Sequence, residues 1–118
     1  MTNLWDYETY RENKSNFCIT SYDSKNNVSL SNSRYDNVVN MDSAREWYAK
    51  NVDSTFSKHC LSVDALSIIN NQVFFIEFKN CKVSKERKDI LQKVHDSISL
   101  HCSVTQESVL DVNNYCDV

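Results

Sequence analysis

Two segments of the chain place apolar residues at three- and four-residue spacing, which is the period of an amphipathic helix. The first stripe consists of Ala44, Trp47, Tyr48, Val52 and Phe56. The second stripe consists of Ile90, Leu91, Val94, Ile98 and Cys102. These patterns predict helices at about 43–57 and 85–102, with Asp42 or Ser43 as N-cap of the first and Ser84 as N-cap of the second.

Between these helices lie two β-rich runs, "CLSVDALSII" and "QVFFIEFKNCKV", separated by Asn70 and Asn71. The chain contains no glycine and no proline, so its tight turns must use residues such as asparagine that tolerate positive φ. An Asn-Asn pair is therefore an acceptable hairpin turn. Both faces of "VFFIEFKN" are largely apolar, which is typical of a strand in the middle of a covered sheet.

The remaining segments are less regular. Within residues 1–40, the apolar islands "NFCITSY" and "NVSLS" are candidate strands, and this part of the chain could complete the sheet. The tail could add a short strand at 108–112. We expect an α/β (α+β) fold, with a small mixed central β-sheet flanked by helices, in one compact domain of residues 1–118 whose core is 43–102.

Composition narrows the class of protein. The 118 residues are 41% hydrophobic, and no apolar run approaches the roughly 20 residues that span a bilayer. The start of the chain lacks an export signal, so we expect a cytoplasmic protein with no membrane association and with free thiols at its five scattered cysteines. A net charge of -3 argues against a generally basic nucleic-acid binder, although it permits a local basic groove.

The hairpin pattern brings two carboxylates together. If Asn70 and Asn71 are the central turn residues, Asp64 lies opposite Glu77, whereas a three-residue loop at 70–72 would shift the register. Directly opposed side chains have Cβ atoms about 5 Å apart. Two carboxylates at that distance in an apolar setting share a proton or bind a divalent cation.

Lys79 lies one pleat beyond Glu77 on the same face of the strand. Two carboxylates and an ammonium can hold Mg2+ or Mn2+ and position a water for attack on a phosphodiester. Lys79 would orient or deprotonate that water, or stabilise the developing charge. A water-facing edge strand with a charged pair is the alternative interpretation of Glu77 and Lys79.

The run "SVDALSIINNQVFFIEFKN" resembles the core signature of the PD-(D/E)XK nuclease superfamily, the restriction-endonuclease-like fold. Asp64, Glu77 and Lys79 fall on its three motif positions, and Val63 stands where the motif has proline. The resemblance implies that Asp64 and Glu77 bind the metal and that Lys79 assists the attacking water. Many members are longer, and only 16 residues follow the second predicted helix for the outer strand and helix of the usual core.

Further candidates flank this triad. Nucleases of this class often carry an additional acid on the preceding helix, but Glu46 falls opposite the apolar stripe, which favours a solvated side chain. The candidate nucleic-acid-binding residues are Lys82, Lys85, Lys88 and Lys93, and Arg87 lies in the same basic run. The alternative is a solvated helix start, since Glu86 and Asp89 dilute the positive charge. Gln92 and Lys93 occupy a position where some relatives add an active-site residue. Lys93, on the flank of the apolar stripe, is the better placed of the two to reach inward, but a surface-exposed side chain is the favoured interpretation of both.

Two functions follow from these residues. The first is a metal-dependent nuclease that hydrolyses phosphodiester bonds in DNA or, less readily, RNA. The alternative is a catalytically silent nuclease-fold protein that binds a protein or a nucleic acid, for example as a phage- or defence-associated inhibitor. A homodimer or a larger protein partner is also possible, because an open sheet edge invites pairing.

Overall fold

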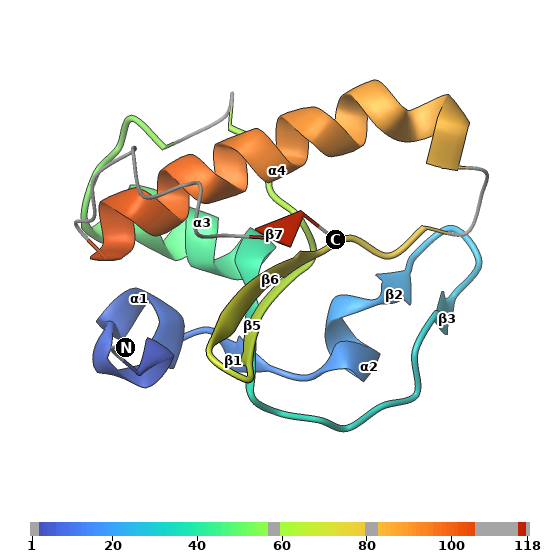
Figure 1. The fold of residues 1–118 in the computed structure, drawn as a ribbon, viewed down its shortest axis with the longest axis horizontal. Coiled ribbons are helices and arrows are strands. Elements are labelled where there is room, and N and C mark those ends of the chain that lie inside the picture. Colours follow the sequence, from blue (N-terminus) through green and yellow to red (C-terminus); the bar gives the residue numbers. More distant parts are fainter. Residues whose placement is uncertain (1–2, 57–59, 80–82, 106–115, 118) are drawn as a thin grey trace.

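The computed structural model describes residues 3–56, 60–79, 83–105 and 116–117. Its helical elements are η1 (Leu4–Asp6), α1 (Glu8–Arg11), α2 (Phe17–Thr20), α3 (Met41–Asn51) and α4 (Val83–Thr105). Its strands are β1 (Lys14–Ser15), β2 (Tyr22–Asp23), β3 (Val28–Ser29), β4 (Val38–Asn40), β5 (Ala65–Ile69), β6 (Gln72–Ile76) and β7 (Cys116–Asp117). Figure 1 shows α4 running across the β5–β6 hairpin, with α1 and the β2–β3 hairpin on opposite sides of it.

The central sheet has five strands in the order β1-β4-β5-β6-β7. The pairs β1–β4, β4–β5 and β5–β6 are antiparallel, whereas β6 and β7 pair in parallel. This mixed sheet with helices confirms the expected α+β class. Residues 1–40 do contribute to the sheet, through β1 and through β4, a strand that the hydrophobic pattern did not predict.

The β5–β6 hairpin has the predicted register. Leu66 pairs with Phe75, and Ile68 pairs with Val73. The two turn residues, Asn70 and Asn71, have φ of 52° and 63°, the left-handed conformation that a type I′ turn requires. The three-residue loop is therefore wrong, and the hairpin brings the residues just beyond its open end opposite each other.

Both strands of this hairpin are shorter than the β-rich runs that predicted them. β5 begins at Ala65 and β6 ends at Ile76, so Asp64 and Glu77 lie just outside the ladder. β6 has neighbours on both sides, since Phe74 pairs with Ser67 of β5 and with Cys116 of β7. The edge-strand interpretation is therefore wrong for the part of β6 that leads to Glu77.

Helix α3 begins and ends earlier than the expected 43–57. Its N-cap is Asn40, whose side chain accepts a hydrogen bond from the Ser43 N–H, so neither Asp42 nor Ser43 is the cap. The helix ends at Asn51 because the Asp53 carboxylate accepts the Thr55 N–H and fixes a turn there. Val52, expected on the apolar stripe, is exposed.

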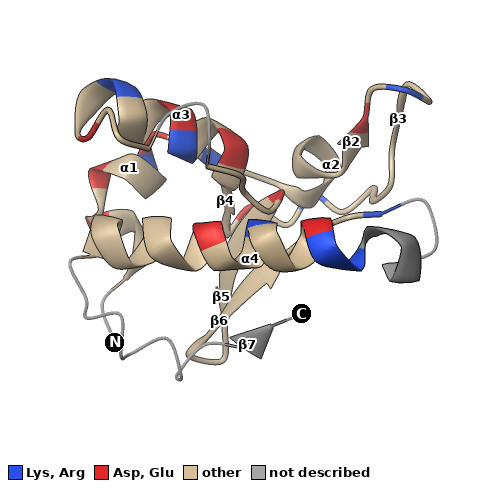
Figure 2. Cartoon of the chain, turned by 90° about the horizontal axis from the view of Figure 1, so that it is seen from above, with Lys and Arg blue, Asp and Glu red and all other residues tan. Residues whose placement is uncertain are grey.

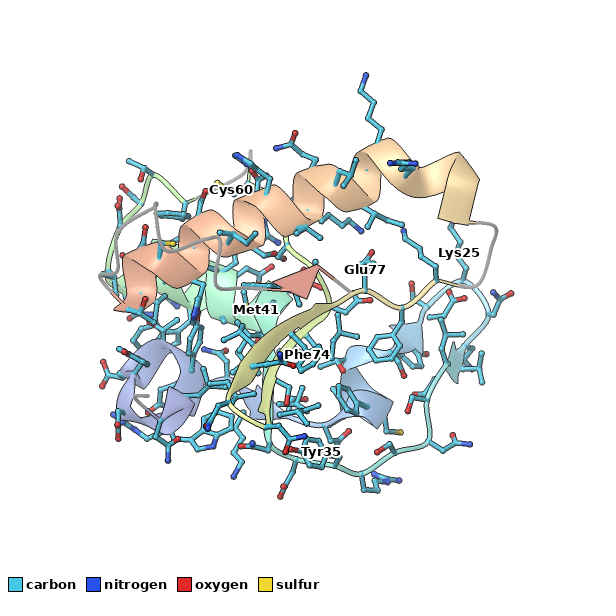
Figure 3. All side chains as sticks on the ribbon, in the orientation of Figure 1. Lys25, Tyr35, Met41, Cys60, Phe74 and Glu77 are labelled. Atoms are coloured by element: carbon cyan, nitrogen blue, oxygen red, sulfur yellow. The ribbon has the colours of Figure 1, made fainter. Side chains whose placement is uncertain are left out.

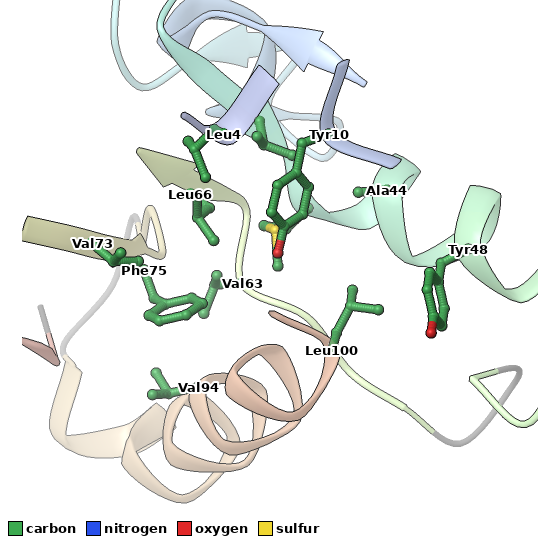
Figure 4. Packing of buried hydrophobic residues seen from close by; sticks show 12 residues of the cluster. Leu4, Tyr10, Ala44, Tyr48, Val63, Leu66, Val73, Phe75, Val94 and Leu100 are labelled. Atoms are coloured by element: carbon green, nitrogen blue, oxygen red, sulfur yellow. The ribbon is translucent and has the colours of Figure 1, made fainter. Parts of the chain in front are cut away.

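Helix α4 is longer than the expected 85–102 and begins at Val83, so Ser84 lies in its first turn and is not the N-cap. Four of the five stripe residues face the core. Leu91 is 53% exposed, because the buried face runs instead through Val94, Ser97 and His101. Figure 4 shows Val94 and Leu100 of α4 packed toward Phe75 and Val63.

The two candidate strands near the N-terminus have different outcomes. Phe17–Thr20 forms the helical turn α2, because the Asn16 side chain accepts the Ile19 N–H at 2.8 Å and caps it. The ends of both islands do pair, as β2 and β3. The strand expected at 108–112 lies outside the described residues.

Within the described residues, no helix combines the length and the apolar character needed to cross a bilayer. Cys18 and Cys60 carry free thiols, as expected. Cys81 and the side chain of Cys116 lie outside the described part of the chain.

Candidate metal and phosphodiester site

Asp64 and Glu77 face each other at the open end of the β5–β6 hairpin. The Asp64 N–H donates to Glu77 Oε1 at 3.2 Å, and the Phe78 N–H donates to Asp64 Oδ2 at 2.9 Å. Beyond the ends of β5 and β6, each carboxylate thus accepts a backbone N–H that has no partner in the strand ladder. The side chain of Glu77 is only 5% exposed, so its charge lies largely out of water.

Two lysines converge on the same oxygen of Glu77. Lys93 Nζ lies 2.8 Å from Glu77 Oε2, and Lys79 Nζ lies 3.4 Å from it. Lys79 comes from the chain after β6, as its position in the Glu-X-Lys motif predicts, whereas Lys93 comes from α4. Lys93 reaches inward to Glu77, so the expectation of a surface-exposed side chain is wrong, and Asp89 one turn earlier pairs with Lys93 at 3.6 Å.

Polar contacts fix α4 over this end of the hairpin. The buried hydroxyl of Ser97 accepts the Val63 N–H at 2.9 Å, and Asp96 accepts the Leu61 N–H at 3.0 Å. Because Lys93 precedes Ser97 by one helical turn, both side chains lie on the same face of α4. The segment that carries Asp64 and the helix that carries Lys93 are therefore held together directly.

A third carboxylate, that of Asp42, lies in the same neighbourhood. The Met41 N–H donates to the Asp64 carbonyl at 3.2 Å, which places the start of α3 beside Asp64. Asp42 then accepts a hydrogen bond from the hydroxyl of Ser62. Although the Asp42 residue is exposed, partial burial raises the pKa of its carboxyl, and the charge of Glu77 adds to this effect.

Asp42 was not expected at this site, because its position before the predicted helix indicated an N-cap. Glu46 was the residue considered as an additional metal-binding acid. Glu46 is exposed, as its helical position indicated. The available signal was the polar spacing of "NMDS", with a better cap, Asn40, two residues before Asp42. Recognising that Asn40 was the cap would have left Asp42 free for another role.

Burial and neighbouring negative charges disfavour the ionised form of Asp64. Burial raises the pKa of Asp64 from 3.8 to about 6, and the nearby charges of Glu77 and Asp42 act in the same direction, against the hydrogen bond from Phe78. Burial lowers the pKa of Lys93, but its hydrogen bond and ion pair with Glu77 outweigh this, and the net shift is upward. A dication here would relieve the repulsion around Asp64.

The carboxylates at this site suit a Mg2+ ion that takes two ligands from the protein. Among the described residues, no group of three or more His, Cys, Asp or Glu side chains is placed to hold a metal. Mg2+ requires fewer protein ligands, since it commonly binds one or two carboxylates and completes its shell with water and substrate phosphate. Asp64 and Glu77 would be those two, provided that Lys93 withdraws from Glu77 Oε2.

The predicted basic surface is only partly described. Arg87 and Lys88 are exposed on α4, where acidic and basic positions are interleaved (Figure 2). Lys82 and the side chain of Lys85 lie outside the described residues. Gln92 is exposed and donates to Asp96 of the same helix, whereas Lys93 contacts Glu77.

A cavity of about 470 Å³ opens beside the acids, between them and the β2–β3 hairpin. Figure 3 shows Glu77 and Lys25 near one another beneath α4. One wall carries Asp64, Glu77, Phe78, Lys79 and Lys93, and the other carries Ser21–Asn26 and Leu30. The sequence did not indicate that the β2–β3 hairpin lines this cavity, because long-range packing places the hairpin opposite Asp64 and Glu77.

Comparison of the chain with protein-family models, with curated proteins and with solved structures found no match.

Proposed function

We propose that this protein is a metal-dependent nuclease of the PD-(D/E)XK type, which hydrolyses phosphodiester bonds in DNA or, less readily, RNA. The main support is the pair of opposed carboxylates, Asp64 and Glu77, which lie at a cavity together with Lys79. The hairpin register that places Asp64 opposite Glu77 is the one expected from a two-residue turn at Asn70 and Asn71.

The arrangement of elements also supports the proposal. The hairpin that carries the motif lies between α3 and α4 in sequence, as the resemblance requires. The short tail provides an outer strand, β7, which pairs in parallel with β6. The restriction-endonuclease-like fold is part of the same proposal.

Each residue has a defined task in this mechanism. Asp64 and Glu77 would hold Mg2+ or Mn2+, which supplies Lewis-acid stabilisation of phosphoryl oxygens and acidifies the attacking water. The Lys79 ammonium, 3.4 Å from Glu77 Oε2, is placed to orient that water or to stabilise the negative charge that develops on the phosphate. Lys93 neutralises Glu77 in the metal-free protein, and from the cavity wall its ammonium would contact the substrate phosphate.

One observation favours the alternative of a catalytically silent binding module. Both oxygens of Glu77 have partners within the chain, Oε1 with the Asp64 N–H and Oε2 with Lys93 and Lys79. A carboxylate satisfied in this way can stabilise the hairpin end without any ion. In that case the cluster is structural, and the protein acts through a protein or nucleic-acid partner.

Cleavage of plasmid and single-stranded DNA and of RNA, with Mg2+ or Mn2+ and with EDTA, separates the two functions. The nuclease proposal predicts cutting that EDTA abolishes and that Asp64→Asn and Glu77→Gln reduce by at least about a hundredfold, which is the scale of losing one electrostatic catalytic group. Glu46→Gln is the matched control, because Glu46 is an exposed acid of α3 outside the cavity.

Wild-type protein that cuts none of these substrates with either ion contradicts the nuclease proposal. Equal loss of activity in Glu46→Gln and Glu77→Gln would also contradict it, because the effect would then not belong to the site.

A further inference from the structure

The cavity beside the acids is bounded by a hairpin that the nuclease mechanism above does not use. β2 and β3 pair Tyr22 with Ser29 and Asp23 with Val28. The residues from Ser21 to Asn26 face Asp64 and Glu77 across the cavity. This hairpin therefore forms the wall of the cavity opposite the carboxylates.

The hairpin tip is built by side-chain hydrogen bonds and is therefore preorganised. Asp23 accepts the Lys25 N–H at 3.0 Å and the Asn26 side-chain amide at 2.7 Å, which is an Asx turn. Asn27 has a φ of 54°, a conformation that asparagine adopts more easily than most residues. Lys25 thus projects from a defined turn and lines the cavity.

Tyr22 is the exposed aromatic residue of this wall. It is 53% exposed and lines the cavity, and its hydroxyl donates to the side chain of Asn27. That hydrogen bond anchors one end of the ring to the hairpin while much of the ring surface stays in water. An anchored and exposed ring loses little entropy when a planar group stacks on it.

The charges of the cavity are balanced. Three lysines, Lys25, Lys79 and Lys93, and three carboxylates, those of Asp23, Asp64 and Glu77, line it. A bound divalent ion would make the cavity net positive and attractive to phosphate. The aromatic ring and Lys25 then lie on the wall opposite the ion, which is the combination that single-stranded nucleic acid binds.

We propose that Tyr22 is a stacking platform for an unpaired base, and that Lys25 contacts an adjacent phosphate, so that the substrate enters this site as a single strand. The inference rests on the proposed nuclease function and names its substrate class. Bases in a duplex stack on each other and do not offer a free face to Tyr22. A cavity of about 470 Å³ also matches a ligand of nucleotide size.

Fluorescence anisotropy with a labelled oligothymidine and with a duplex of equal length tests the inference, in Ca2+ and in EDTA. We expect Tyr22→Ala to weaken single-strand binding by about 5- to 150-fold, the scale of one base–aromatic stack, while Tyr22→Phe stays within about threefold of wild type. Val28→Ala is the control, because Val28 is an exposed apolar residue of the same hairpin outside the cavity lining.

Lys25→Ala tests the phosphate contact separately. We expect it to lower the slope of log affinity against log salt by about 0.7, the value for one phosphate contact with a single strand. Tyr22→Leu provides a second stacking variant if Tyr22→Ala is poorly folded by circular dichroism, because it keeps apolar bulk and removes the aromatic face.

Single-strand affinity that is unchanged in both Tyr22→Ala and Tyr22→Leu would overturn the inference, as would tighter binding of the duplex or no binding of the single strand. Cleavage by the wild type separates this failure from failure of the nuclease proposal. Cutting without any dependence on Tyr22 overturns only the stacking platform, whereas Tyr22-dependent binding without cutting overturns only the nuclease.

Discussion

Lys93 of α4 and Glu77, which follows β6, form an ion pair with 2.8 Å between Nζ and Oε2. The Lys93 side chain is 22% exposed and that of Glu77 is 5% exposed, so the pair spans the border between core and cavity. It neutralises a carboxylate that is otherwise costly to bury. Any ion that binds Glu77 through Oε2 must compete with this lysine.

Lys93→Ala should destabilise the protein by about 1–3 kcal/mol in the absence of metal, because Oε2 of the buried Glu77 would keep only the longer contact to Lys79, with the Asp64 N–H still on Oε1. Urea denaturation measures this change. Mn2+ should restore more stability to Lys93→Ala than to the wild type, since the competitor for Glu77 is gone.

Lys88→Ala is the matched control, as Lys88 is an exposed lysine on the same helix, and it should change stability by less than about 0.5 kcal/mol. If Mn2+ gave no preferential stabilisation of Lys93→Ala, competition between the lysine and an ion would be ruled out.

The contribution of Asp64 to metal-free stability should fall as pH rises from about 4 to about 7, through its folded pKa of about 6. The raised pKa means that the folded state holds a proton on Asp64 that the unfolded state, with a pKa near 3.8, has released. Protonation therefore favours folding below the unfolded pKa, and this contribution is lost by pH 7. Asp64→Asn should flatten the dependence, measured as the urea midpoint against pH. An identical slope in the two proteins would contradict the assignment.

Mn2+ affinity should change in the opposite direction, because the ion needs the ionised form of Asp64. Below pH 6 the apparent affinity should fall by about tenfold per pH unit if binding releases one proton. Calorimetry at several pH values measures this trend, and pH-independent affinity between 5 and 7 would show that Asp64 is not a ligand.

The turn at Asn70 and Asn71 should respond to substitution according to its positive φ angles. Asn71→Ala should cost about 1 kcal/mol, since a Cβ without a compensating polar group disfavours the left-handed region, whereas Asn71→Gly should be neutral or stabilising. Thermal unfolding of the two variants distinguishes these effects. Equal stability of the alanine and glycine variants would contradict the turn geometry.

Ser97→Ala should disturb the site from a distance. It removes the acceptor of the buried Val63 N–H and should cost about 1–2 kcal/mol. Because Ser97 fixes α4 over the end of the hairpin, activity should fall as well, through poorer placement of Lys93. Ser99→Ala, at an exposed position two residues further along α4, is the control and should leave both quantities unchanged.

Local patterns were sufficient for the features that depend on neighbouring residues. The Asn-Asn turn and the register of the hairpin follow from turn chemistry and alternation, so they could be predicted from the sequence. The inward position of Lys93 could not, because helical spacing places it on the flank of the apolar stripe, where surface exposure was expected. The same alternation predicts that Glu77 and Lys79 lie on one face, and Lys79 Nζ does lie 3.4 Å from Glu77 Oε2.

Long-range packing decided the rest. β4 is too short for its pattern to be visible, and it becomes a strand because β1 and β5 lie on either side of it. Asp42 lies near Asp64 because the start of α3 is joined to that segment, where the Met41 N–H donates to the Asp64 carbonyl. Leu91 fits the apolar stripe but is exposed, since the face of α4 that packs is fixed by Ser97 and Asp96, polar residues that a hydrophobic pattern does not weigh.

The most direct test of the central claim is titration calorimetry of Mn2+ into the wild type and into Glu77→Ala at pH 7. The proposed site predicts binding by the wild type and none by the folded variant, with cleavage of DNA lost in the same variant. No heat of binding in the wild type, or equal affinity in the two proteins, would contradict a metal site at Asp64 and Glu77.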